Sequence, residues 1–215
     1  MPWRKEALMS LVFYYAPYST SMTAHWALEE LGIPYEKVKL DLQKGDTSKP
    51  EFLALNPNGK VPTLVHEGTA IFESAAIIAY LGETFGVEKG LFPAPGPRRG
   101  EALKWLVWIN VSLAEALARF QRNTSELTPK EQHNAKAAEV AKADVEKLLG
   151  ILDGALQGKE FLVGGSFSLV DVHASAFVGY LGMCGFDPTK WSAIGAWLKT
   201  CSSQPAYGRI ISPDA

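Results

Sequence analysis

The sequence predicts a two-domain protein in which an α/β domain precedes an all-α helical bundle. The first ~80 residues carry strand and helix patterns in the order β-α-β-α-β-β-α, which is one compact α/β unit. A stretch rich in proline and glycine, Gly90 to Gly100, then reads as an interdomain linker. Beyond it, almost every apolar pattern has the period of a helix. The predicted limits are 9–86 for the first domain, 87–100 for the linker and 101–215 for the all-α domain.

The first half of the α/β domain contains two strand patterns and two helix patterns. Residues 11–15 (LVFYY) predict a buried strand, because they are short, aromatic and β-branched. Residues 20–31 predict a helix that ends at Gly32, a natural C-terminal stop. Residues 35–42 alternate apolar and polar side chains, which is typical of a half-buried strand, and a short helix is possible at residues 50–54.

The second half of this domain predicts a hairpin followed by a helix. Residues 61–65 and 70–72 are the two expected strands, and residues 66–69 (HEGT) are a turn of suitable length that contains glycine. The helix is expected over residues 74–81.

The all-α domain is predicted from apolar faces and helix-start patterns. Residues 101–120 carry tryptophan and leucine on one face. Thr128, followed by proline at once and glutamate three residues later, predicts the start of a second helix. Ser168 and Asp171 predict a capping box at the start of another.

Composition and charge exclude several function classes. The chain has 215 residues, 47% hydrophobic and 20% charged, with a net charge of −2, so neither nucleic acid nor an anionic membrane is an expected partner. No apolar stretch is long enough to span a bilayer, and residues 1–10 have no features of a secretion signal. Cys184 and Cys201 have no metal-site spacing and are expected as free thiols in a reducing, cytoplasmic compartment. The four histidines form no ligand pair either, so no metal is predicted.

Four residues suggest a binding slot beside a helix N-terminus. Pro62 opens a strand and cannot donate to the ladder; if the Val61-Pro62 bond is cis, the Val61 backbone faces outward and can pair with an extended peptide. Ser74 begins a helix whose first amides favour an anion, and Glu73 can receive an ammonium group. The simpler alternatives are an edge strand with a trans proline and a serine that only caps the helix.

The segment that joins the first strand to the first helix is rich in hydroxyl groups. A helix N-terminus favours an anion, and a hydroxyl there can donate a hydrogen bond to a thiolate. Turn formation and helix capping are the alternative roles of such hydroxyls. The hydroxyl residues of this segment are Tyr14, Tyr15, Tyr18, Ser19, Thr20 and Ser21.

The motifs, taken in order, resemble those of the cytosolic glutathione transferases over nearly the whole chain. The chain shows LVFYYAP, AHWALEELGIPYEKVKLDL, KPEFLALNPNGKVPTLV, IFESAAIIAYL and FSLVDVHASAF. The resemblance implies a thioredoxin-like N-terminal domain, an all-α C-terminal domain and a homodimer. It also implies glutathione as co-substrate in the first domain and an apolar pocket for a second substrate.

The resemblance assigns glutathione-binding roles residue by residue. The Val61 backbone, beside cis Pro62, would pair with the cysteinyl unit. Glu73 and Ser74 would hold the γ-glutamyl end. Lys60 would approach the glycyl carboxylate, with Lys44 as a second candidate.

The catalytic position departs from the patterns of the family. Beta-like bacterial members carry a cysteine where this chain has Thr20, and their histidine on the second domain falls near Ala114. Serine-type members would place their hydroxyl at Tyr18, and tyrosine-type members at Tyr14 or Tyr15. The missing loop cysteine argues against thiol–disulfide exchange as the main activity.

The predicted function is conjugation of glutathione to small apolar electrophiles, with a peroxidase side activity possible and detoxification as the general role. A hydroxyl of Tyr18, Ser19 or Thr20 is expected to stabilise the glutathione thiolate. Two alternatives remain open. One is a non-catalytic ligand-binding or assembly protein of the same fold; the other is a glutathione-dependent isomerase, dehalogenase or ether-cleaving enzyme.

Overall fold

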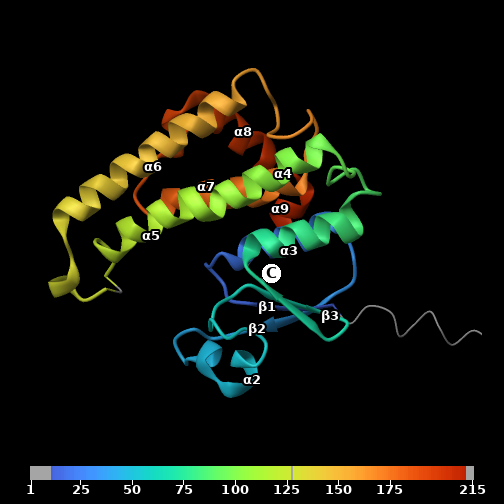
Figure 1. Ribbon diagram of the computed structural model, residues 1–215, viewed down its shortest axis with the longest axis horizontal. Helices are drawn as coiled ribbons and strands as arrows, with labels where there is room; N and C mark the ends of the chain where they lie inside the picture. The colour runs from blue at the N-terminus through green and yellow to red at the C-terminus, as the bar shows by residue number, and fades with distance from the viewer. Residues whose placement is uncertain (1–10, 127, 212–215) are drawn as a thin grey trace, which may run out of the picture. The chain divides into compact units, whose positions relative to one another are not determined.

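The computed structural model describes residues 11–126 and 128–211, which form two compact units. The first unit extends to Pro93 and also takes in the segment from Pro205 onward; the second comprises Ala94–Gln204. A four-stranded mixed sheet with helices makes up the first unit and helices make up the second, which confirms the predicted fold class (Figure 1). The prediction of no secretion signal concerns residues 1–10, which lie outside the described residues.

The sheet has the strand order β2-β1-β3-β4. Strand β1 (Leu11–Tyr15) runs parallel to β2 (Glu36–Lys39) and antiparallel to β3 (Thr63–His66), which pairs in turn with β4 (Thr69–Phe72). Because side chains alternate along a strand, Leu11 and Phe13 of β1 share one face and both are fully buried. Strand β1 is therefore central, as its apolar sequence predicts.

The hairpin between β3 and β4 is tighter than the sequence pattern indicates. Only Glu67 and Gly68 separate the strands, with φ values of 50° and 78°. A two-residue turn with both central residues at positive φ matches the right-handed twist of the strands. The strands therefore extend further into the predicted four-residue turn than expected.

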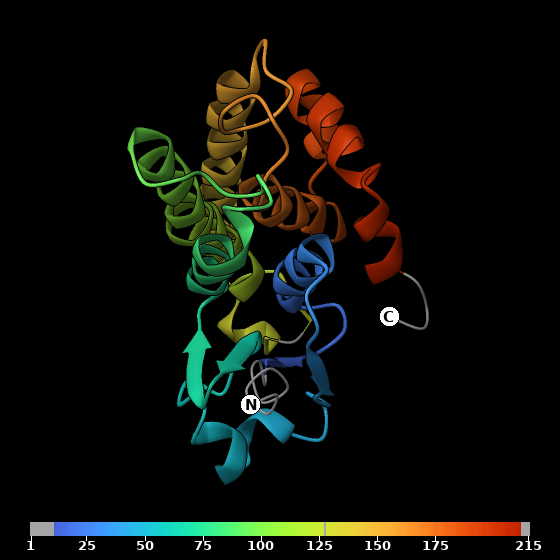
Figure 2. The same cartoon turned by 90° about the vertical axis from the view of Figure 1, so that its right-hand side faces the viewer.

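Helices cover both faces of the sheet. Helix α3 (Ser74–Leu81) and helix α1 (Ser21–Leu31) pack against each other, while the short α2 (Pro50–Leu53) lies beyond the opposite face (Figures 1 and 2). Two further turns belong to this unit: the 3₁₀ segment η1 (Asp46–Ser48) and the π segment η2 (Gly82–Gly86), which continues α3.

The last helix, α9 (Pro205–Ile210), packs on α1 (Figure 2). Tyr207 contacts Trp26, with 4.7 Å between ring centroids. Arg209 donates from Nε to Glu29 Oε2 at 2.8 Å and from an amino nitrogen to the Glu29 carbonyl, also at 2.8 Å. These contacts group α9 with the first unit, whereas the limits predicted from sequence assign it to the second domain.

The described residues of the second unit form helices and short helical turns, with no strand among them. A nearly continuous run begins with α4 (Pro97–Trp108), passes through the π segment η3 (Ile109–Leu113) and ends with α5 (Ala114–Arg122). The other segments are η4 (Lys130–Gln132), α6 (Ala135–Leu156), α7 (Leu169–Met183), η5 (Pro188–Lys190) and α8 (Ser192–Ser202).

The predicted helix start at Thr128 is wrong. The proline and glutamate that follow it form only the turn η4, and α6 begins at Ala135. Asn134 is the N-cap, and its side-chain oxygen accepts from Ala137 N at 3.0 Å. Asparagine is as good an N-cap as threonine, and the observed cap satisfies an otherwise unpaired donor of the first turn.

The capping box at the start of α7 is confirmed, and it lies deep in the core. Asp171 Oδ2 accepts from Ser168 N at 3.1 Å and from Ser168 Oγ at 2.8 Å. Asp171 Oδ1 accepts from Leu162 N at 2.9 Å and from Trp197 Nε1 at 3.0 Å. This carboxyl group is fully buried and joins the start of α7 to α8 and to the segment before α7.

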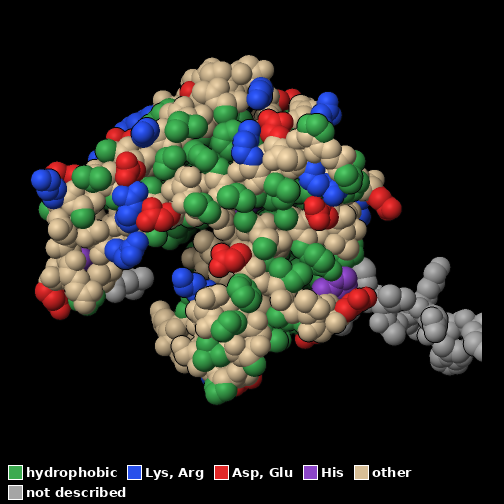
Figure 3. All heavy atoms as spheres, viewed as in Figure 1, with side chains coloured by type: hydrophobic (Ala, Val, Ile, Leu, Met, Phe, Trp, Pro, Cys, Tyr) green, Lys and Arg blue, Asp and Glu red, His purple; other side chains and the backbone are tan. Residues whose placement is uncertain are grey.

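The surface matches the nearly neutral composition. On the face drawn in Figure 3, acidic and basic side chains are intermingled. Among the described residues, no helix has the length and apolar character needed to cross a membrane.

Candidate functional site

The Val61-Pro62 peptide bond is cis, and the chain around it is held by a buried asparagine. Asn56, only 2% exposed, donates from Nδ2 to the Lys60 carbonyl at 2.7 Å and to Thr63 Oγ1 at 3.1 Å. Its side-chain oxygen accepts from the Asn58 amide at 3.1 Å. Asn56 therefore satisfies its polar atoms by fixing the backbone on both sides of Val61, which is half-buried.

Glu73 has a backbone conformation that non-glycine residues rarely adopt. Its φ is 69° and its ψ is 117°, immediately before α3. Such strain persists only where the surroundings enforce it, and it is common at ligand-binding sites. The side chain of Glu73 is exposed, so the conformation leaves the carboxylate accessible to a ligand.

Ser74 is the first residue of α3 and not its N-cap. The cap position is occupied by Glu73, whose carbonyl accepts from Ile77 N at 3.0 Å. The interpretation of Ser74 as a helix cap is therefore wrong. Ser74 is 7% exposed and stands in the first turn, where helix amides carry partial positive charge.

The hydroxyl residues in the loop between β1 and α1 have different environments. Tyr18 has a φ of 54° and is 90% exposed. Ser19 is built into the turn: its Oγ lies 2.7 Å from the Ala16 carbonyl, to which it donates, and accepts from Ser21 N at 3.2 Å. Ser19 therefore organises the loop.

Thr20 joins this loop to the segment of the cis proline. Its Oγ1 donates to the Val61 carbonyl at 3.3 Å, across 41 positions of sequence. The hydroxyl is exposed, and Thr20 directly precedes α1. A hydroxyl group, a peptide carbonyl and a helix N-terminus thus meet at one exposed place.

The other hydroxyl residues of the segment face elsewhere. The Tyr14 ring packs near Phe52, with 5.9 Å between centroids. On the opposite side of the strand, Tyr15 stacks on Phe13 at 5.6 Å and lies near His25. Ser21 is buried and accepts from the Ala16 amide at 3.4 Å.

The basic groups near the site differ in whether an acidic side chain already pairs with them. Lys44 forms an ion pair with Asp41, with Nζ and Oδ2 3.1 Å apart. Lys60 is exposed, and no ion pair involves it among the described residues. Burial lowers the pKa of His25, and the charge of Lys37 adds to this effect, so both favour the neutral ring. Among the described residues, no group of three or more His, Cys, Asp or Glu side chains could hold a metal ion.

This arrangement offers three things to a small peptide anion. The half-buried Val61 backbone provides a place for an extended peptide to pair. Glu73 and the first turn of α3 provide a carboxylate and a helix N-terminus. Thr20 provides a hydroxyl donor at the start of α1. Sequence reasoning missed Asn56, because an asparagine in a Pro- and Gly-containing turn usually suggests an exposed loop.

Two family models and several known proteins match most of the chain. The family model described as "Glutathione S-transferase, N-terminal domain" matches residues 9–83, and that described as "Glutathione S-transferase, C-terminal domain" matches residues 105–205. Glutathione S-transferase GstB of Escherichia coli is 29% identical over 186 residues, which is 86% of this chain and 88% of GstB. The disulfide-bond oxidoreductase YfcG of E. coli is 29% identical over 209 residues, covering 92% of this chain and 93% of YfcG.

The chain is also similar to several solved structures. A sphingomonad glutathione S-transferase complexed with glutathione is 30% identical, with a TM-score of 0.79 over 93% of this chain and 96% of the other. The nitrogen regulation fragment of the yeast prion protein Ure2p has a TM-score of 0.85 over 94% of this chain and 95% of the fragment. At 20% identity, the similarity to Ure2p shows the fold alone.

Proposed function

Because this chain belongs to the cytosolic glutathione transferase family, we propose that it binds glutathione in its first unit and conjugates it to small apolar electrophiles. The observation that carries this proposal is the contact between Thr20 Oγ1 and the Val61 carbonyl. It brings a proton donor at a helix start to the backbone that would receive the cysteinyl unit.

The proposed position of glutathione follows the polar groups of the site. The cysteinyl unit pairs with the Val61 backbone beside Pro62. The γ-glutamyl end meets the first turn of α3, where Ser74 receives its carboxylate and the exposed Glu73 its ammonium group. Lys60, exposed on the same segment, approaches the glycyl carboxylate. The similar sphingomonad glutathione S-transferase was solved with glutathione, which supports glutathione as the ligand.

We assign the activating hydrogen bond to Thr20 in preference to Tyr18 or Ser19. The Tyr18 side chain is directed into solvent, and the Ser19 hydroxyl is used within the turn. The Thr20 hydroxyl makes a longer bond of 3.3 Å to Val61, which a bound cysteinyl amide would replace. The Thr20 proton would then be available to the sulfur.

The chemistry requires a thiolate at neutral pH. A free thiol with a pKa near 8.5 is only a few per cent ionised there, and lowering it by two units corresponds to about 2.7 kcal/mol. The Thr20 hydroxyl and the N-terminus of α1 both favour the anion. The thiolate then forms a bond to an electrophilic carbon, while the leaving group departs with the electron pair; attack on a peroxide oxygen would give the side activity.

The test is an ultraviolet titration of the thiolate in the complex with glutathione, together with a conjugation assay on a reactive aryl halide. Thr20→Val is expected to raise the thiol pKa by one to two units, while Thr20→Ser keeps it low. Tyr18→Phe serves as a matched control that leaves the Thr20 hydroxyl and the hydrogen bonds of the loop in place. An unshifted thiol pKa in the unaltered protein would remove the activation mechanism. Glutathione binding without turnover of several electrophile classes would favour a carrier function.

The match to YfcG supports a second candidate, glutathione-dependent reduction of disulfides. The missing loop cysteine does not prevent it if two glutathione molecules react in turn. The first thiolate attacks a substrate disulfide and releases one thiolate; a second attacks the mixed disulfide and yields oxidised glutathione and the second thiolate. Reduction of hydroxyethyl disulfide, coupled to glutathione reductase and NADPH, separates this activity from conjugation.

We also propose a homodimer and, by analogy with the family, a cytoplasmic role in detoxification. Leu103 and Val107 of α4 and Val111 of η3 are spaced by four residues and form an exposed apolar stripe, with Val111 66% exposed. A second copy of the chain is the occupant this stripe would take. Light scattering is expected to give a dimer mass for the unaltered protein and a lower mass for Val107→Glu with Val111→Glu.

A further inference from the structure

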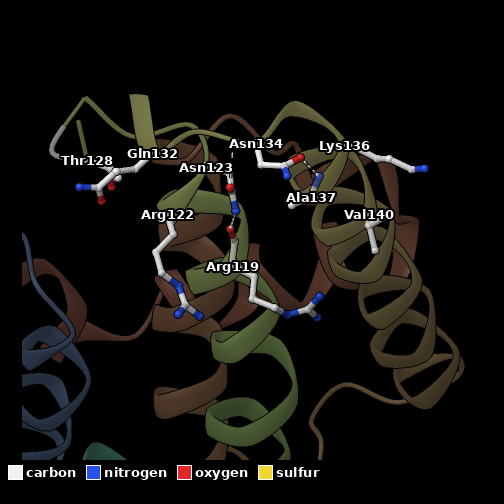
Figure 4. A pocket seen from close by; sticks show the side chains of 9 residues that line it. All are labelled: Arg119, Arg122, Asn123, Thr128, Gln132, Asn134, Lys136, Ala137 and Val140. Carbon is white, nitrogen blue, oxygen red and sulfur yellow. Dashed lines mark hydrogen bonds between the residues drawn. The ribbon is translucent and has the colours of Figure 1, made fainter. Parts of the chain in front are cut away.

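A pocket of about 700 Å³, lined by several basic and amide side chains, lies within the second unit, between the end of α5 and the start of α6. Figure 4 shows Arg119 and Arg122 reaching from α5 in different directions, with Asn123 and Asn134 between the two helices and Lys136 at the far rim. This volume suits a small organic molecule and exceeds that needed by a single inorganic ion.

The arginine side chains that line the pocket differ in how closely acidic side chains pair with them. Arg119 is held by two carboxylates: its Nε lies 2.8 Å from Glu115, and one amino nitrogen lies 2.9 Å from Asp144. A guanidinium has five N–H donors, so these two bonds fix its position and leave donors for a ligand. Arg122 is 68% exposed, and its closest described carboxylate is Glu115 at 4.0 Å.

The rest of the lining adds donors and no negative charge. Of the described residues that line the pocket, none is acidic. Lys136 has no ion pair among the described residues. It stands in the first turn of α6, and that turn contains no acidic residue. Asn134 uses its oxygen to cap α6, which leaves its amide nitrogen as a donor. Arginine, lysine and amide donors together suit oxyanions.

We infer that this pocket binds a small organic molecule with two separated acidic groups, such as a dicarboxylate or a bisphosphate. One acidic group meets Arg119 and Arg122, which lie on α5 and both approach Glu115, and the other meets Asn134 and Lys136 at the start of α6. Two acidic groups are needed because these donors come from two different helices. This site lies wholly on the second unit and does not depend on the residues proposed for glutathione.

The test is isothermal titration of the full chain at low ionic strength with glutarate and, separately, with fructose 1,6-bisphosphate. S-hexylglutathione is added at saturation to occupy the proposed glutathione site. Arg122→Ala combined with Lys136→Ala is expected to weaken binding at least about tenfold, because one cation is removed from each of the two helices. The better of the two probes identifies carboxylate or phosphate as the preferred group. Acetate and inorganic phosphate, each with one acidic group, are expected to bind more weakly.

Two controls make the result specific to the pocket. Lys147→Ala removes an exposed lysine of α6 that does not line the pocket, and it is expected to leave the affinity unchanged. Circular dichroism and conjugation activity report whether the double variant is folded. Equal affinity in the double variant, or no binding of either probe to the unaltered protein, would overturn the proposal. Equal affinity for the probes with one acidic group would overturn the requirement for two.

Discussion

The starts of α1 and α7 both carry hydroxyl groups, yet the two helix starts are built in opposite ways. At α7, Ser168 and Asp171 are buried, and their polar atoms bond to each other and to neighbouring core groups. At α1, Ser19 and Ser21 close the turn, but the Thr20 hydroxyl stays exposed and bonds to a distant segment. A hydroxyl at a helix start is therefore structural where its bonds close locally, and a functional candidate where they lead elsewhere.

The largest expected effect concerns the buried start of α7. Asp171→Ala leaves four buried donors without their acceptor, and we expect a loss of about 3 to 5 kcal/mol in the free energy of unfolding. Urea denaturation of the full chain measures it. Asp187→Ala is the matched control, because Asp187 also accepts from a helix-start amide, that of Thr189, but is exposed. Equal losses in both variants would contradict the distinction between buried and exposed helix starts.

The second largest effect is a pH dependence of the folding stability, which arises from a histidine in α7. Burial lowers the pKa of His173 to about 4, and its Nε2 lies 2.8 Å from Asn110 Oδ1. Between pH 6.5 and 4 the unfolded chain binds this proton and the folded chain does not, so stability falls as the pH falls. The expected loss approaches about 3 kcal/mol by pH 4.

Comparison of unfolding curves for the unaltered protein and His173→Gln isolates this residue. The variant is expected to show a shallower decline below pH 6.5, because glutamine does not titrate. Parallel declines would show that other groups cause the acid sensitivity.

The third effect separates function from stability at α1. Thr20→Val is expected to lower kcat/KM for conjugation about 10- to 100-fold at neutral pH, which corresponds to about 1.4 to 2.7 kcal/mol. Because Thr20 is exposed, the free energy of unfolding is expected to change by less than about 0.5 kcal/mol. The activity loss is expected to shrink at high pH, where glutathione ionises without assistance. A stability loss as large as the activity loss would place Thr20 with the structural hydroxyls.

The same contrast explains what the sequence could predict. Strand β1 and the start of α7 were predictable because each depends on a short local pattern, an apolar run or Ser168 followed by Asp171. The contact of Thr20 with Val61 and that of Arg209 with Glu29 join segments 41 and 180 residues apart, and no local pattern specifies them.

The loop between β1 and α1 shows most clearly what the sequence alone could not predict. Tyr18, Ser19 and Thr20 are equivalent by sequence position and by chemistry, and only the backbone path directs one of them to Val61. The unusual conformation of Glu73 and the burial of Asn56 likewise depend on the tertiary structure around them.

The smallest expected effect tests a third helix start, that of α6, which is exposed but closes locally. Asn134→Ala removes the bond to Ala137 N, and we expect a loss of about 1 kcal/mol in the free energy of unfolding, with no change in conjugation. Asn134→Asp keeps the acceptor and adds a negative charge that favours the helix N-terminus, so stability is expected to be retained. That same charge is expected to weaken the binding of bisphosphates in the pocket beside α6, since it stands near Lys136 and Arg119. A loss of conjugation in Asn134→Ala would break the rule that locally closed helix starts are structural.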